Sequence, residues 1–200
     1  NWQGLFAQAE YNKDAISAVI SVAGNNTSYK REDYFKYTPD DPLRETDWVN
    51  FTAFSTKGGV NYRLDEKHNV FGNLGYFERA PFSDAVFLNN TNVTNEDAVN
   101  QKIFSAELGY GFRGDKFRAD LNVYRTQWMD RTYTVSRTAN NIQYTANILG
   151  IDALHQGVEL ELQYRPVETL TLTGMASLGD WQWANNVNNV QVFDDQQNPI

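Results

Sequence analysis

Cysteine is absent from the 200 residues, which excludes a disulfide framework and any metal site built on thiolates. Basic residues are few, because 17 Lys and Arg stand against 25 Asp and Glu and give a formal net charge of -8. A nucleic-acid-binding surface needs a basic patch, so nucleic acid is not an expected partner. The longest uncharged apolar stretch, residues 15–24, is about half as long as a membrane helix requires. If the chain crosses a bilayer, it crosses it as strands.

Aromatic residues are abundant although the chain as a whole is polar. The sequence contains 11 Tyr, 12 Phe and 5 Trp, while only 41% of its residues are hydrophobic. A soluble β-protein can combine these properties. An outer-membrane β-barrel also combines them, because only every second residue of each strand faces lipid.

Residues 157–178 predict a β-hairpin. Val158 to Tyr164 alternate strictly between apolar and polar side chains, and this period of two indicates a strand with two different faces. Pro166 cannot donate to a strand ladder, so we expect the strand to end at a turn over residues 165–169. Residues 170–178 then alternate again and return along the first strand.

The same pattern occurs three more times. The predicted fold is therefore an all-β, antiparallel sheet of eight strands in four hairpins, in which very short turns alternate with long loops. The short turns are centred near residues 13, 66, 115 and 167, and the long loops cover residues 30–48, about 78–101, and a third segment between residue 128 and the last hairpin.

An aromatic residue precedes each short turn on the apolar face of the entering strand: Tyr11, Tyr62, Phe112 and Tyr164. Such a row is typical of the ring of aromatic side chains that lies at the headgroup level around a membrane β-barrel. A soluble β-sandwich has no physical reason to keep large rings in one row at one end. The pattern favours a transmembrane barrel.

Three segments resemble the β-barrel of TonB-dependent outer-membrane receptors: residues 77–82 (FERAPF), 105–110 (SAELGY) and 156–162 (QGVELEL). The resemblance covers essentially the whole chain. It implies that residues 1–200 are part of one barrel domain of a bacterial outer-membrane protein, without the plug domain and the final strands. It also implies active uptake of a scarce or large ligand, such as a siderophore, vitamin, glycan or peptide. In this reading the short turns are periplasmic, the long loops are extracellular and capture the ligand, and the TonB complex drives a rearrangement of the plug.

This resemblance assigns roles to side chains by their parity along the strands. Eight charged residues are expected to face the lumen and to pair with the plug: Glu10, Lys57, Arg63, Glu107, Arg118, Asp120, Glu159 and Glu161. Five others are lumen-facing and close to the long loops, where aromatic faces can stack on a sugar, siderophore or peptide and a guanidinium can pair with an anion. These candidate ligand contacts are Phe77, Arg79, Trp128, Trp181 and Trp183.

No enzyme motif is present in the sequence. Gly109, Gly111 and Gly114 match a dinucleotide-binding spacing, but a strand follows them where that motif needs a helix. We therefore expect no catalytic residue, metal or cofactor. A passive porin-like channel and a soluble secreted glycan-binding domain remain alternatives, and the ligand class and a surface lipoprotein partner stay open.

Overall fold

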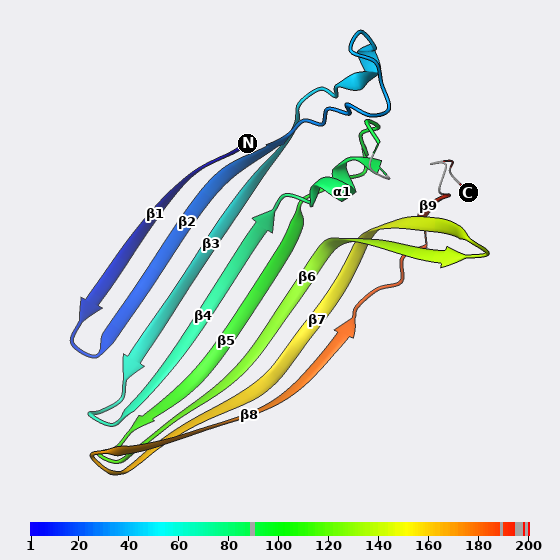
Figure 1. Cartoon of the computed structure of the whole chain (residues 1–200). Helices are drawn as coiled ribbons and strands as arrows, with labels where there is room; N and C mark the ends of the chain where they lie inside the picture. The colour runs from blue at the N-terminus through cyan, green and yellow to red at the C-terminus, as the bar shows by residue number, and fades with distance from the viewer. Residues whose placement is uncertain (89–90, 189, 195–197, 199) are drawn as a thin grey trace.

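The computed structural model describes residues 1–88, 91–188, 190–194, 198 and 200. It contains a single antiparallel sheet in which each of the first eight strands pairs with its neighbours in sequence, in the order β1 to β8, and β9 adds to β7 (Figure 1). The strands are β1 (Trp2–Lys13), β2 (Ile16–Tyr29), β3 (Val49–Arg63), β4 (His68–Arg79), β5 (Gln101–Arg113), β6 (Phe117–Ala139), β7 (Ile142–Val167), β8 (Leu170–Trp183) and β9 (Gln191–Phe193). Among the described residues, the 3-10 helix η1 (Pro42–Arg44) and the helix α1 (Ser83–Val86) lie in the connections.

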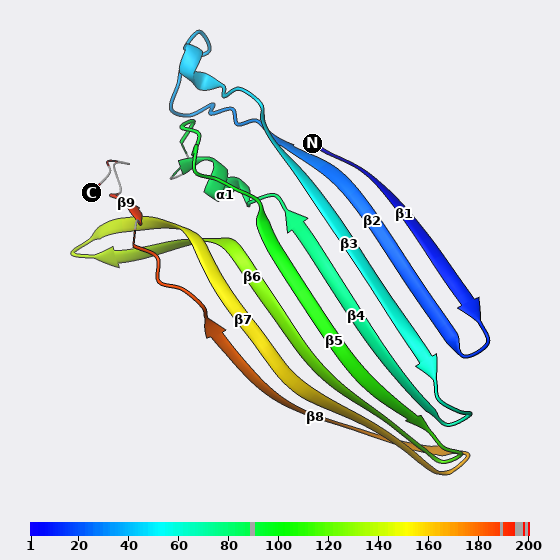
Figure 2. The same ribbon diagram turned by 180° about the vertical axis from the view of Figure 1, so that it is seen from behind.

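The predicted all-β antiparallel architecture is confirmed. The turns at residues 14–15, 64–67, 114–116 and 168–169 gather at one end of the curved sheet, and the long connections gather at the other (Figures 1 and 2). The sheet does not close on itself within the described residues, since β1 and β8 form its edges. None of the described helices is long and apolar enough to cross a membrane.

The strand register places the apolar side chains of all eight strands on one face, which we call the apolar face; the opposite one is the polar face. Between the aromatic residues beside the turns and the charges at the long-connection end, the apolar face carries no charged side chain in these strands. One register row crosses the entire sheet on this face: Tyr11, Ala18, Val60, Gly72, Leu108, Val123, Val158 and Leu178.

This register row runs diagonally across the apolar face. It begins at Tyr11, two residues from a hairpin turn, and ends at Leu178, two residues before Asp180 at the opposite border. Each hairpin is therefore staggered relative to the previous one. Closure of a sheet into a barrel requires tilted strands and a stagger of this kind.

Aromatic side chains border the apolar face at the turn end, as the sequence predicts. Tyr62 pairs with Val70, Phe112 pairs with Ala119, and Tyr164 pairs with Phe117, each in the last rows before the turns. Most of these rings are exposed; the exposed fractions of Tyr11, Tyr62 and Tyr164 are 54%, 45% and 45%. On β3 the face continues from Tyr62 to Phe54, about 26 Å along the strand at the usual rise per residue.

The prediction of a third long loop, between residue 128 and the last hairpin, is wrong. β6 and β7 continue as one hairpin that ends in the two-residue turn Asn140–Asn141, where both residues have positive φ (51° and 62°), as a tight hairpin turn requires. The hairpin bends away from the sheet (Figures 1 and 2). The register shifts at this bend, beside Asp130 (φ 56°) on β6 and Gly150 (φ 70°) on β7, so a bulge in each strand accompanies the corner.

The predicted end of the strand at Pro166 is also wrong. β7 continues to Val167 because the register shifts between Tyr164 and Val167. Pro166 lies in the resulting bulge, where the strand ladder needs no N–H donor from it. The Nζ of Lys116 and the backbone N–H of Arg165 link this segment to the neighbouring turn, through Pro166 O and Lys116 O.

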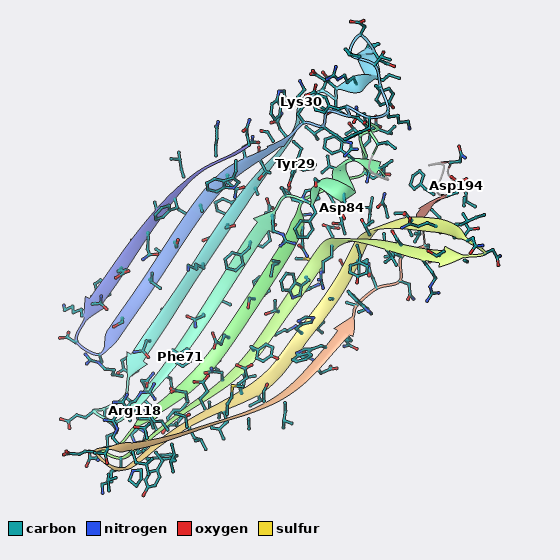
Figure 3. All side chains as sticks on the ribbon, viewed as in Figure 1. Tyr29, Lys30, Phe71, Asp84, Arg118 and Asp194 are labelled. Carbon is teal, nitrogen blue, oxygen red and sulfur yellow. The ribbon has the colours of Figure 1, made fainter. Side chains whose placement is uncertain are left out.

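Buried side chains concentrate in the connections rather than on the sheet. Ala85, Val86 and Phe87, in and after α1, are almost fully buried. The amide of Asn92 donates to the carbonyls of Leu43 and Arg44, so the connection between β4 and β5 packs on the connection between β2 and β3. Figure 3 places Tyr29, Lys30 and Asp84 at this end of the molecule.

Asp65 organises the turn between β3 and β4, and the turn should respond to acid. Its carboxylate accepts hydrogen bonds from the N–H groups of Lys67 and His68, both 2.8 Å, and these bonds hold the pKa of Asp65 below its ordinary value. A depressed folded-state pKa gives stability that is present above the unfolded pKa and is lost as pH falls through the folded one. We expect Asp65→Asn to lower the thermal midpoint at pH 7. The difference in thermal midpoint between the variant and the wild type should become smaller as the pH approaches 3.

The measurement is a series of thermal unfolding curves between pH 7 and pH 3. Glu66→Gln is the matched control, since no hydrogen bond to the Glu66 carboxylate occurs in the described chain. An offset for Asp65→Asn that does not change with pH would contradict the expectation.

Candidate functional site

The eight charged residues predicted to face the lumen all lie on the polar face by register. Three of them bind neighbours there. Glu107 accepts a hydrogen bond from Asn73 (3.0 Å), Asp120 pairs with Arg113 (2.7 Å), and Glu10 accepts from Gln8 (2.8 Å).

Of the other five charges, one has a partner in the described chain and four do not. Arg63 donates to the carbonyl of Asp14 beside the first turn. Lys57, Arg118, Glu159 and Glu161 have no hydrogen-bond or ion-pair partner within the part of the chain that the structure describes. Arg118 lies near the turn end of the sheet (Figure 3). The polar face therefore carries unpaired charges of both signs.

Several aromatic rings occupy the side-chain space of glycines on the polar face. A Cβ on Gly109 would lie 2.2 Å from the ring of Phe71, its register partner on β4. A Cβ on Gly179 would lie 2.8 Å from the indole of Trp181. A large ring next to a glycine can thus lie flat against the backbone of the sheet, with one side of the ring exposed.

Three of the predicted ligand contacts meet in one cluster at the long-connection end of the polar face. Trp128 and Trp183 are both register partners of Ala153, one on each side of β7. His155 lies between Trp128 and Trp181, with ring centroids 6.2 Å and 6.0 Å away. The indole N–H of Trp181 donates to the hydroxyl of Tyr124 (3.1 Å) across β7.

Arg131 completes this group. Its guanidinium carbon lies 5.2 Å from the ring centroid of Trp128 and 5.7 Å from that of Trp183, so the cation contacts two π-faces. We call Tyr124, Trp128, Arg131, His155, Trp181 and Trp183 the tryptophan cluster. Trp181 and Trp183 are its most exposed members, at 67% and 62%.

The other two predicted ligand contacts lie apart from the tryptophan cluster. Phe77 is in the same register row, but Ile103 of β5 separates it from Trp128. Arg79 donates to the buried side chain of Gln101 (2.7 Å), and its guanidinium stacks on Phe82 at 4.6 Å. These contacts hold Arg79 against the connection between β4 and β5.

Sequence reasoning missed three members of the tryptophan cluster. On β6, Tyr124 has the same parity as Trp128, and on β7, His155 has the same parity as Glu159. This alternation was enough to place both residues on the polar face. No such signal existed for Arg131, because simple alternation places it on the face opposite Trp128. The bulge beside Asp130 adds one residue to β6 and brings Arg131 to the same face.

Acid groups in the described part of the chain do not gather into a metal site: no group of three or more His, Asp or Glu side chains there could hold an ion. Two carboxylates lie next to Arg131 or to its register partner Ile151, and both have other partners. Asp130 pairs with Lys102 (3.1 Å), and Asp152 accepts the backbone N–H of Asp130 (3.1 Å).

Comparisons with known proteins agree with this architecture. Among solved structures, the copper transporter OprC is similar over 96% of this chain with a TM-score of 0.69 and 16% sequence identity, a likeness that concerns the fold. The matched region is 31% of that chain, so the present sequence spans about a third of its length. No curated protein sequence matches. The family model described as "TonB dependent receptor-like, beta-barrel" matches residues 1–199, and the chain therefore belongs to the TonB-dependent receptor β-barrel family.

Proposed function

We propose that this chain forms part of the barrel wall of an outer-membrane receptor that imports a scarce or large ligand by TonB-dependent active transport. The observation that carries the proposal is the register row on the apolar face. It is uncharged across all eight strands and runs diagonally between an aromatic border and a charged border. A lipid-facing barrel wall needs these features, and the family is one of outer-membrane receptors and transporters.

In this proposal the polar face lines the lumen. The unpaired charges Lys57, Arg118, Glu159 and Glu161 would then find partners on a plug domain, because a charge enclosed without a partner is costly. The turns would lie in the periplasm and the long connections outside the cell. The tryptophan cluster would lie where a ligand enters from outside, and Phe77 and Arg79 would lie at the same end of the polar face but apart from it.

Thiol labelling tests the orientation, because this chain has no cysteine and any cysteine elsewhere in the protein can be replaced beforehand. In the parent protein, single cysteines at Val158, Glu159, Leu160 and Glu161 are treated in intact membranes with a small water-soluble maleimide. We expect residues 159 and 161 to react and residues 158 and 160 to be protected until detergent is added. Protection of 158 and 160 that persists in detergent and ends only on unfolding would indicate a cover of protein and a soluble domain.

Energy coupling is tested with the same Glu159→Cys variant in living cells. If TonB rearranges a plug next to the polar face, labelling at residue 159 should rise several-fold in energised cells and lose this rise when TonB is deleted. A passive channel would label equally in both strains. Glu10→Cys on β1 gives a second polar-face position, and Leu160→Cys is the lipid-facing control.

A further inference from the structure

We propose that the tryptophan cluster binds a ring compound that carries a carboxylate or a similar oxyanion. This inference rests on the proposed function and adds a ligand class to it. It is argued from the balance of hydrogen-bond donors and acceptors in the cluster, from the flat rings, and from the position of Arg131.

The tryptophan cluster offers donors without matching acceptors. Arg131 carries five N–H groups and makes no ion pair or hydrogen bond within the described residues, while two indole rings hold its guanidinium in place. The indole N–H of Trp128 is buried and also without a partner. A buried donor left unpaired costs free energy, so both groups favour an oxygen acceptor supplied by a ligand.

The surroundings leave the anionic position open. Asp130 and Asp152, which flank Arg131 at the corner of the β6–β7 hairpin, are bound to Lys102 and to the backbone. The segment after β8 also fixes the corner, because the side chain of Asn185 donates to Gly150 O (2.7 Å) and accepts from Asp152 N–H (2.9 Å). Arg131 therefore lies at a corner that hydrogen bonds hold in place. Neither Asp130 nor Asp152 forms an ion pair with it.

The neighbouring rings supply a flat apolar surface for the rest of the ligand. Trp181 occupies the side-chain space of Gly179 and is held in place by its hydrogen bond to Tyr124, so one side of its ring stays exposed. Trp183 lies two residues further along the same face, about 7 Å away by strand rise. A sugar ring or an aryl ring can stack on such faces while its acid group meets Arg131.

The test is a calorimetric titration of the detergent-purified parent receptor with three probes: a uronic-acid trisaccharide, a neutral hexose trisaccharide and benzoate. At least one acidic probe should bind about ten-fold or more tightly than the neutral one, as expected for a charge-assisted hydrogen bond. The acidic probe that binds distinguishes a glycan from an aryl acid. Equal or absent binding of all three probes overturns the proposal.

Variants then locate the binding site. Arg131→Gln should weaken the acidic probe about ten-fold or more, and Arg131→Lys should also weaken it, because an ammonium lacks the planar fork of donors. Arg137→Gln, further out on the same hairpin, is the matched control and should bind like wild type. Wild-type binding by both Arg131 variants overturns the assignment. Heat-modifiable mobility in SDS gels checks that each variant is folded.

Binding in detergent needs no TonB, so this inference and the proposed function fail separately. Loss of acid-selective binding with intact TonB-dependent labelling at residue 159 would overturn the ligand class alone. Acid-selective binding without any TonB effect would overturn the transport mechanism alone.

Discussion

Replacing Leu160 by Arg should lower the free energy of unfolding of the inserted barrel by about 2–4 kcal/mol, the usual cost of a cation on the lipid face at the bilayer midplane. Leu160 pairs with Leu121 on β6 and Ala176 on β8. It lies midway between the aromatic border at Tyr164 and the first polar position of that face, Gln156. An arginine there has neither a partner nor water.

Denaturant unfolding of the parent protein in lipid vesicles measures this loss. Glu161→Arg is the matched control, because residue 161 lies on the opposite face, where its register partner on β6 is Asp120. We expect the control to change the free energy of unfolding much less than Leu160→Arg does. Equal losses for the two variants would show that lipid does not cover the apolar face.

Gly157→Ala should destabilise the protein by about 1–3 kcal/mol, the usual cost of overpacking. A Cβ at this position would lie 2.5 Å from the backbone oxygen of Leu178 and 2.9 Å from the hydroxyl of Tyr124. A backbone atom cannot move aside as the end of a side chain can, so β8 must shift relative to β7. The substitution should also disturb the hydrogen bond between Trp181 and Tyr124, and with it probe binding.

Gly174→Ala provides the control, since no atom lies within 4 Å of a Cβ built there. It should leave stability unchanged or raise it by up to about 1 kcal/mol, because alanine restricts the unfolded chain. Both variants are compared by denaturant unfolding in vesicles. If Gly157→Ala is as stable as Gly174→Ala, the close approach of β7 and β8 at Gly157 is not a constraint on the fold.

The two faces of the sheet have different roles in the proposed receptor. The apolar face has the same uncharged character on every strand, since lipid places the same demand on each of them. The polar face varies along its length. It carries charges of both signs toward the turns and aromatic rings toward the long connections, which suits contact with a plug at one end and with a ligand at the other.

The sequence by itself determined the parts of the fold that depend on neighbouring residues. The alternation in Val158 to Tyr164, the four short turns and the aromatic border at Tyr11, Tyr62, Phe112 and Tyr164 are local patterns, because a strand places every second side chain on the same face. The face of each predicted lumen charge followed from the same period, and so did the common face of Trp128, Trp181 and Trp183.

Only the tertiary structure decided where the alternation breaks. The bulges beside Asp130 and Gly150, and the passage of β7 through Pro166, depend on register with neighbouring strands that a single-strand pattern does not contain. These breaks turned an expected loop into the long β6–β7 hairpin. They also brought Arg131 to the face of Trp128, because one inserted residue moves every later side chain to the opposite side.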